Sequence, residues 1–116
     1  MKKKIIDFLK IKKIIKSLKK RGKKIVHCHG VFDLLHIGHI KHFESAKKFG
    51  DILIVTVTPD KFVNKGFNRP HFNSQQRIEG LASIEIIDFV ILNKTSNAID
   101  IIKKIKPDFF CKGSEY

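Results

Sequence analysis

Apolar residues along the chain alternate between two patterns. Short continuous apolar runs, typical of buried strands, are followed by segments in which apolar residues recur every three or four positions, as in helices. The runs predict strands at 24–29, 51–58, 88–92 and 108–112, and the periodic segments predict helices at 37–49, 73–83 and 97–106. This alternation within one domain predicts an α/β fold: a Rossmann-like, doubly wound parallel sheet between two helical layers.

The segment before the first of these strands is strongly basic. Residues 4–20 predict an amphipathic helix, because Ile11, Ile15 and Leu18 share one face and lysines occupy the other. We therefore divide the chain into an N-terminal basic helix at 1–22 and a domain at 23–116. The lysine face could bind an anionic membrane surface. We favour the alternative, in which the apolar stripe packs on the domain and the lysines are solvated.

The composition of the chain indicates which kinds of partner it binds and in which compartment we expect it. The 116 residues carry a formal charge of +13, which implies an anionic partner such as a nucleotide, a phosphorylated substrate, a nucleic acid or a membrane surface. No apolar run approaches the ~20 residues of a membrane span. Two cysteines make no disulfide framework, so we expect a cytoplasmic protein. Neither a dinucleotide-binding glycine motif nor a P-loop motif is present.

The segment from Gly30 to His39 joins the first of these strands to the helix at 37–49. A strand that turns into a helix directs backbone N–H groups and the positive end of the helix dipole at one spot, which favours a phosphate. His36 and His39 are three positions apart and share a helix face. Gly38 leaves room for a ligand beside the backbone. These features predict a polyphosphate site, although histidines at a helix start are often only structural.

Two further groups of residues are candidates for binding. Lys65 and Arg69 lie in a Gly- and Pro-containing loop, where clustered positive charge suggests binding of a substrate phosphate, or else a solvated surface loop. His27 and His29 alternate along a strand and could converge on one side of it. No other residue stands at a metal-ligand spacing from them, so we expect no protein-built metal site.

The string Gly-Val-Phe-Asp at 30–33, followed by His-Ile-Gly-His at 36–39, resembles the signature of the cytidylyltransferase-like nucleotidyltransferases. These include glycerol-3-phosphate cytidylyltransferases and the adenylyltransferase domain of bacterial heptose synthesis. The similarity resumes at Lys-Gly 65–66, Arg-Pro 69–70 and Lys-Gly 112–113. It implies transfer of CMP or AMP from a nucleoside triphosphate to a phosphorylated sugar or polyol, with release of pyrophosphate, in envelope or capsule precursor synthesis.

The resemblance also assigns roles to residues. It implies catalytic roles for His36, His39 and Arg77, and binding of the substrate phosphate by Lys65 and Arg69. It implies nucleotide binding by Val31, Phe32, Asp33, Gly38, Lys47, Gly113 and Ser114. It further implies CTP or ATP as partner, Mg²⁺ held mainly through the triphosphate, no nucleic acid, and a homodimer.

Family members continue past the segment that corresponds to 112–116, with a further strand and a helix start that closes on the triphosphate. We therefore expect the domain to be truncated at its C-terminus. The alternative function is a truncated nucleotide-binding module without turnover. Charge alone would suggest a nucleic-acid binder, but the interleaved exposed aromatic residues that stack on bases are missing.

Overall fold

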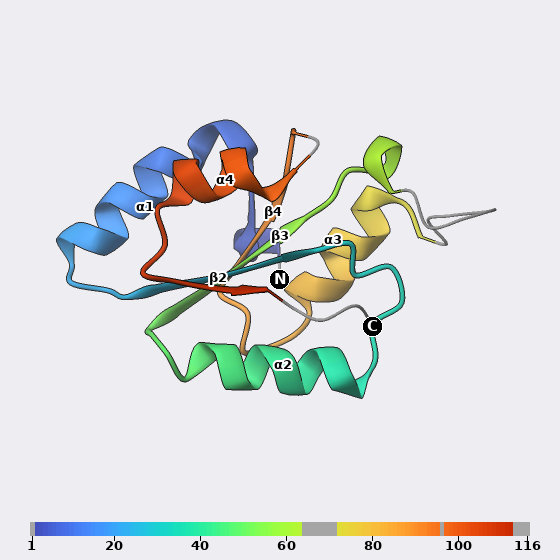
Figure 1. The fold of residues 1–116 in the computed structure, drawn as a ribbon, viewed down its shortest axis with the longest axis horizontal. Helices are drawn as coiled ribbons and strands as arrows, with labels where there is room; N and C mark the ends of the chain where they lie inside the picture. The colour runs from blue at the N-terminus through green and yellow to red at the C-terminus, as the bar shows by residue number, and fades with distance from the viewer. Residues whose placement is uncertain (1, 64–71, 96, 113–116) are drawn as a thin grey trace.

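The computed structural model describes residues 2–63, 72–95 and 97–112. They form a parallel five-stranded sheet with helices on both faces (Figure 1). In chain order the strands are β1 (Ile5–Ile6), β2 (Ile25–Gly30), β3 (Ile52–Val57), β4 (Phe89–Leu92) and β5 (Phe109–Lys112). The helices are α1 (Ile11–Lys20), α2 (Ile37–Lys47), α3 (Ser74–Ala82) and α4 (Ala98–Ile105). Three short 3₁₀ turns are η1 (Lys2–Lys4), η2 (Phe8–Lys10) and η3 (Asp60–Phe62).

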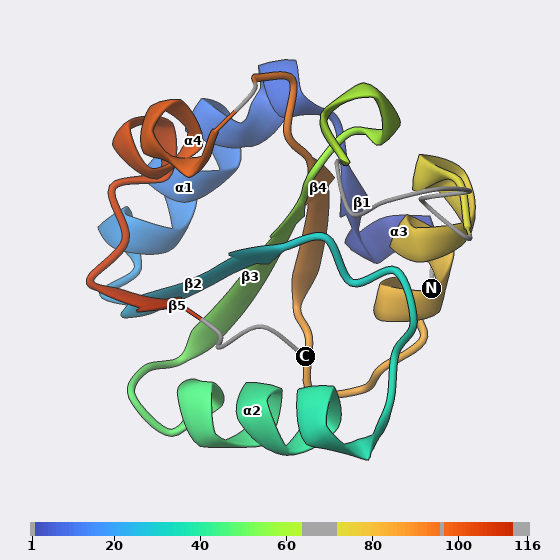
Figure 2. The ribbon, with the colours of Figure 1, turned by 45° about the vertical axis from the view of Figure 1, so that its right-hand side comes forward.

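Successive residues of the central strands bury their side chains in two separate cores. Val55 of β3 packs with Phe43 of α2 and Leu81 of α3. Ile54, the preceding residue, packs with the isoleucines of α1 and α4. Helices α2 and α3 therefore cover one face of the sheet, and α1 and α4 cover the other (Figure 2). The predicted doubly wound α/β architecture is confirmed.

The strand order is β1-β4-β3-β2-β5, and every neighbouring pair is parallel. Because the strands are parallel, their carboxyl ends meet at one edge of the sheet, where ligands bind in this architecture. The segments that leave β2, β3 and β4 therefore start beside one another. The predicted strands and helices of the domain each lie within about two residues of their observed bounds, which is the usual uncertainty at element ends.

The N-terminal prediction was wrong in its extent. Residues 4–20 do not form one helix, because Ile5 and Ile6 pair with Val90 and Ile91 as an edge strand of the sheet. The carboxylate of Asp7 then accepts a hydrogen bond from the Leu9 N–H and caps η2. A two-residue strand is too short to show an alternating pattern, so the helical spacing that begins at Ile11 masked it.

The helix caps were partly anticipated by the sequence. Asn73 caps α3 and exchanges hydrogen bonds with Gln76, in the capping box that the sequence predicted. Helix α4 begins one residue later than expected, with Asn97 as its cap in place of the predicted Ser96. Ser96 itself lies outside the described residues.

None of the helices in the described part of the chain combines the length and the apolar character that crossing a bilayer would require.

Candidate active site

Two histidines lie together at the start of α2, and the backbone fixes both rings. His36 is the N-cap, and its Nδ1 accepts a hydrogen bond from the Gly38 N–H at 3.0 Å. The His36 N–H in turn donates to Nδ1 of His39 at 3.2 Å. The ring centroids are 4.1 Å apart. The structure therefore brings together the two residues that the sequence placed on one helix face.

These backbone contacts also decide where each neutral ring carries its proton. Because both Nδ1 atoms accept a backbone N–H, the proton of each neutral imidazole lies on Nε2. His39 is buried and His36 is exposed. The start of α2 thus combines two oriented imidazole Nε2–H groups with the positive end of a helix, a combination that suits phosphate oxygens.

The glycines of the motif make room for neighbouring rings. A Cβ on Gly38 would lie 2.7 Å from Cε1 of His36, and a Cβ on Gly30 would lie 2.8 Å from Cζ of Phe32. The sequence interpretation of Gly38 as open space for a ligand therefore needs correction, since the His36 ring fills that space. Glycine at 38 is required for His36 to fold back over the first turn of α2.

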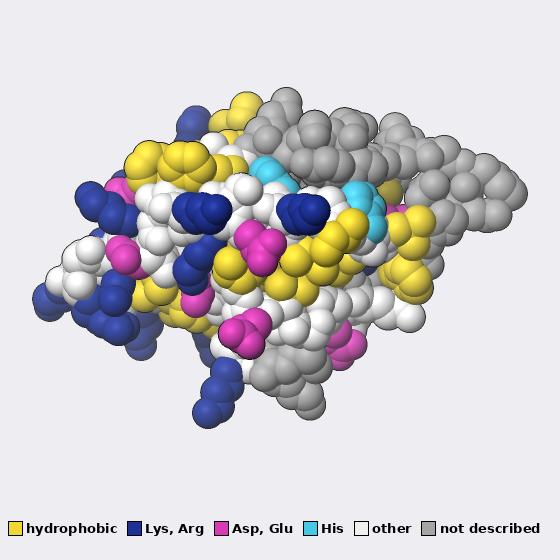
Figure 3. Space-filling view, turned by 90° about the horizontal axis from the view of Figure 1, so that it is seen from below, with side chains coloured by type: hydrophobic (Ala, Val, Ile, Leu, Met, Phe, Trp, Pro, Cys, Tyr) yellow, Lys and Arg dark blue, Asp and Glu magenta, His cyan; other side chains and the backbone are white. Residues whose placement is uncertain are grey.

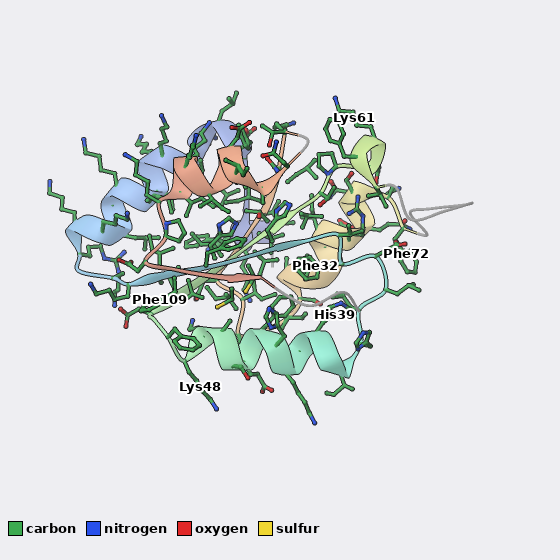
Figure 4. The ribbon with its side chains drawn as sticks, in the orientation of Figure 1. Phe32, His39, Lys48, Lys61, Phe72 and Phe109 are labelled. Carbon is green, nitrogen blue, oxygen red and sulfur yellow. The ribbon has the colours of Figure 1, made fainter. Side chains whose placement is uncertain are left out.

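Phe32 supports His39 from the side. Its φ is +51°, a left-handed conformation that is unusual for a bulky residue. The ring packs against His39 with centroids 5.8 Å apart and against Phe43 with centroids 5.4 Å apart. Figure 4 shows Phe32 beside the strand end, above His39 at the start of α2. Its aromatic ring thus contributes to the site by orienting His39.

The guanidinium of Arg77, for which the sequence predicted a catalytic role, contacts protein groups in this structure. Its side chain is fully buried, and it donates to the Val31 carbonyl at 2.8 Å, the Phe72 carbonyl at 3.1 Å and Asp60 Oδ1 at 2.7 Å. It therefore ties the segments that follow β2 and β3 to the start of α3. This positioning role is what a buried, planar donor with several N–H groups can supply.

Asp33 and Asp60 complete this connection between segments. Asp33 Oδ1 accepts the Phe72 N–H at 2.8 Å, which joins the motif to the residues before α3. Burial raises the pKa of Asp60, but hydrogen bonds from Arg77 and Ser74 outweigh that effect and leave its pKa below the ordinary value. Both carboxylates thus hold loops in place around the start of α2.

Lys47, which the sequence assigned to nucleotide binding, pairs with a carboxylate of the protein in this structure. It lies at the far end of α2 from His36, a distance of about 15 Å for an eleven-residue helix. Its Nζ pairs with Asp88 Oδ2 at 2.5 Å. The same carboxylate oxygen accepts the Leu53 N–H at the start of β3. Lys47 therefore stabilises the amino edge of the sheet.

Four predicted site residues cannot be placed. Lys65, Arg69, Gly113 and Ser114 lie outside the described residues.

Sequence reasoning missed a buried polar network between β2 and β3. His27 Nε2 and His29 Nδ1 each lie 2.7 Å from Thr56 Oγ1, and His29 Nε2 lies 3.4 Å from Thr58 Oγ1. Burial, and to a smaller extent the charge of nearby His29, together lower the pKa of His27 to about 3. Burial also lowers the pKa of His29 to about 4. The sequence did offer a signal for this network: Thr56 and Thr58, at the end of β3 and directly after it, have the same two-residue spacing as His27 and His29.

His27 and His29 converge on the hydroxyl of Thr56. No group of three or more His, Cys, Asp or Glu side chains in residues 2–63, 72–95 and 97–112 is arranged to hold a metal ion. Both histidines are instead neutral hydrogen-bonding partners of threonine hydroxyls.

Comparisons with known proteins agree with this geometry. The family model described as "Cytidylyltransferase-like" matches residues 27–116. The chain is 44% identical over 114 residues to the "Bifunctional protein HldE" of a Nitratiruptor species, which covers 97% of this chain and 25% of that protein. It is 42% identical over 114 residues to the protein of the same name from Sulfurimonas denitrificans, covering 97% of this chain and 24% of that one. The chain thus spans about a quarter of the length of these curated relatives.

A solved structure is also similar. It is described as the lipopolysaccharide core biosynthesis protein from Thermoplasma volcanium, and it superposes with a TM-score of 0.67 at 31% sequence identity. The match covers 77% of this chain and 73% of that structure.

Proposed function

The chain belongs to the cytidylyltransferase-like family, and from this premise we propose that it acts as a nucleotidyltransferase. It would transfer CMP or AMP from CTP or ATP to a phosphorylated sugar or polyol, with release of pyrophosphate. The observation that carries the proposal is the pair of imidazoles at the start of α2, whose Nδ1 atoms are both occupied by backbone N–H groups.

The chemistry suits this arrangement of donors. A phosphate oxygen of the acceptor attacks the α-phosphorus, and the bond to the pyrophosphate oxygen breaks. The acceptor is already an anion, so positioning and charge stabilisation carry the reaction without a strong general base. The Nε2–H groups of His36 and His39 donate to the phosphates as negative charge moves toward pyrophosphate. Phe32 and Arg77 keep these donors in place through the contacts described above.

Mg²⁺ fits this proposal as an ion held mainly by substrate oxygens. The residues that the structure describes offer no carboxylate cage, and Mg²⁺ in phosphoryl-transfer sites often relies on substrate phosphates. When bound, it would neutralise charge on the triphosphate.

The relatives support a class of acceptor for the proposed reaction. Similarity to HldE proteins and to a lipopolysaccharide core biosynthesis protein supports a sugar phosphate that is a precursor of the cell envelope. The second candidate function is nucleotide binding without turnover.

Pyrophosphate release distinguishes the two functions. The chain is mixed with Mg²⁺, CTP or ATP, and a panel of sugar and polyol phosphates. Turnover is expected with one nucleotide, and His36→Ala and His39→Ala should each reduce it on the order of 10²–10³-fold. Asn97→Ala is the control, because it removes the cap of α4 and leaves the start of α2 unchanged. Nucleotide binding without pyrophosphate release would favour the binding module, and full activity of both histidine variants would contradict the assigned site.

A further inference from the structure

A lysine-lined groove lies on the face of the sheet opposite α2. Helices α1 and α4 run side by side there (Figures 1 and 2), and the groove between them has a volume of about 470 Å³. Ile15 and Ile105 lie at its buried floor. Its charged lining is one carboxylate, Asp100, and six lysines: Lys12, Lys16, Lys19, Lys103, Lys104 and Lys106.

The lysines of α1 face outward because the apolar stripe of this helix packs against the sheet. Ile11, Ile15 and Leu18 are buried against the sheet, so α1 has no second apolar face to insert into a partner. Two groove lysines are also held in place: Lys19 Nζ donates to the Lys106 carbonyl at 2.5 Å, and Lys104 Nζ lies 4.0 Å from the centroid of the Phe8 ring.

The concentration of one charge distinguishes this face from the opposite one. Figure 3 shows the α2 face, where acidic, basic and hydrophobic side chains are interspersed and many of the basic ones gather at its left end. On the α1–α4 face, six lysines around one groove repel one another unless an anion lies between them. The face therefore complements a surface with many negative charges.

The kind of cation indicates the kind of partner. The groove lining contains neither arginine nor an aromatic residue. Arginine supplies the rigid, bidentate donors of shaped phosphate sites, and aromatic rings supply the stacking surfaces of single-stranded nucleic-acid sites. Lysine ammonium groups on flexible stems suit the diffuse charge of anionic lipid headgroups.

Exposed apolar side chains lie at the same end of both helices. Leu9, in the η2 turn that precedes α1, is 80% exposed, and Ile99, in the first turn of α4, is 60% exposed. Both helices begin near the middle of the molecule and run toward its left side in Figure 1. Apolar residues beside a lysine-rich surface are typical of elements that lie in a membrane interface.

We propose that the α1–α4 face docks on an anionic phospholipid bilayer, with the groove lysines among the headgroups and Leu9 and Ile99 at the boundary of the acyl region. This inference goes beyond nucleotidyl transfer and does not depend on it. The contact is peripheral, since the apolar stripe of α1 stays on the sheet.

Vesicle sedimentation tests the docking. The 116-residue chain should bind vesicles of phosphatidylglycerol and phosphatidylcholine at low salt, should bind more weakly as salt is raised, and should not bind phosphatidylcholine alone. One lysine near such a surface accounts for about fivefold in affinity. The double variant K16Q/K103Q should therefore lose about 25-fold. The control K41Q/K48Q removes the same charge from two exposed positions, one in α2 and one directly after it, and should lose much less affinity.

A second pair of variants tests the apolar contribution. Leu9→Ser should lower vesicle affinity roughly tenfold at unchanged net charge. Phe49→Ser, at a position 58% exposed beyond the end of α2, should leave it unchanged. The proposal is overturned if the chain does not bind anionic vesicles or if the two lysine doubles lose affinity equally. Binding of duplex DNA or pyrophosphate is measured in the same way, in place of vesicles. The proposal is also overturned if the chain binds either of these anions and the K16Q/K103Q substitutions abolish that binding.

Discussion

The guanidinium of Arg77 and the carbonyl of Val31 are 46 residues apart in sequence and 2.8 Å apart in space. This bond joins α3 to the segment that turns from β2 into α2. The same side chain binds Asp60 after β3, so one buried arginine fixes two neighbouring loops at the carboxyl edge of the sheet. The positions of His36 and His39 therefore depend on Arg77, because it holds the segment that leads from β2 into α2.

Arg77→Ala should reduce both stability and turnover. It leaves the Val31 and Phe72 carbonyls without this donor, and hydrogen bonds to charged groups contribute about 1.5–3 kcal/mol each to stability after exchange with water is taken into account. Asp60 is 44% exposed, so its share is smaller. We therefore expect the free energy of unfolding, measured in urea, to fall by at least about 3 kcal/mol.

Arg77→Lys separates positioning from charge. It keeps the positive charge but cannot make three directed bonds, so turnover should stay low while nucleotide affinity falls less. Wild-type turnover in the lysine variant would show that the charge, and not the bonding geometry, is what matters.

Gly38→Ala should reduce turnover without unfolding the chain. The added Cβ would lie 2.7 Å from the His36 ring and must displace it. Gly80→Ala in α3 is the matched control, since its Cβ would lie 3.5 Å from Leu35, an ordinary contact, and should gain about 0.5–1 kcal/mol from helix propensity. Pyrophosphate release and thermal melting measured on both variants check this. Equal activities would mean that His36 does not need its capped position.

The sequence predicted the sheet, its helices and the paired histidines because each leaves a local pattern. Continuous apolar runs marked β3 and β4, and the three-residue spacing placed His36 and His39 on one face. The roles of Arg77 and Lys47 could not be predicted, because they depend on partners 46 and 41 residues away. A helix lysine looks the same in sequence whether it faces a phosphate or, as here, the carboxylate of Asp88.

Lys47→Gln should leave nucleotidyl transfer unchanged. The side chains of Lys47 and Asp88 are 27% and 31% exposed, so breaking their ion pair should cost no more than about 1 kcal/mol. The ammonium lies at the end of α2 away from the histidines. Steady-state kinetics and urea unfolding check the two parts of this expectation. A large rise in KM for the nucleotide would contradict the placement of Lys47 outside the site.

The buried histidines of β2 should make the fold sensitive to mild acid. Burial lowers the pKa of His27 to about 3 and that of His29 to about 4, whereas an unfolded histidine has a pKa of about 6.5. Below pH 6.5 the unfolded chain therefore binds more protons than the folded chain, so stability falls as pH falls from 6.5 to about 4. Each histidine contributes a slope of up to about 1.4 kcal/mol per pH unit in this range.

The variant His29→Asn tests which groups carry this slope. His29 is partly exposed at the end of β2, so asparagine can replace it without opening a cavity, and it removes one of the two titrating groups. Urea unfolding between pH 7 and 4.5 should then show about half the wild-type slope. Asp60 does not confuse the result, because its pKa lies below 3.8 and its contribution is lost only at lower pH. An unchanged slope in the variant would mean that groups other than the His27–Thr56–His29 network govern acid sensitivity.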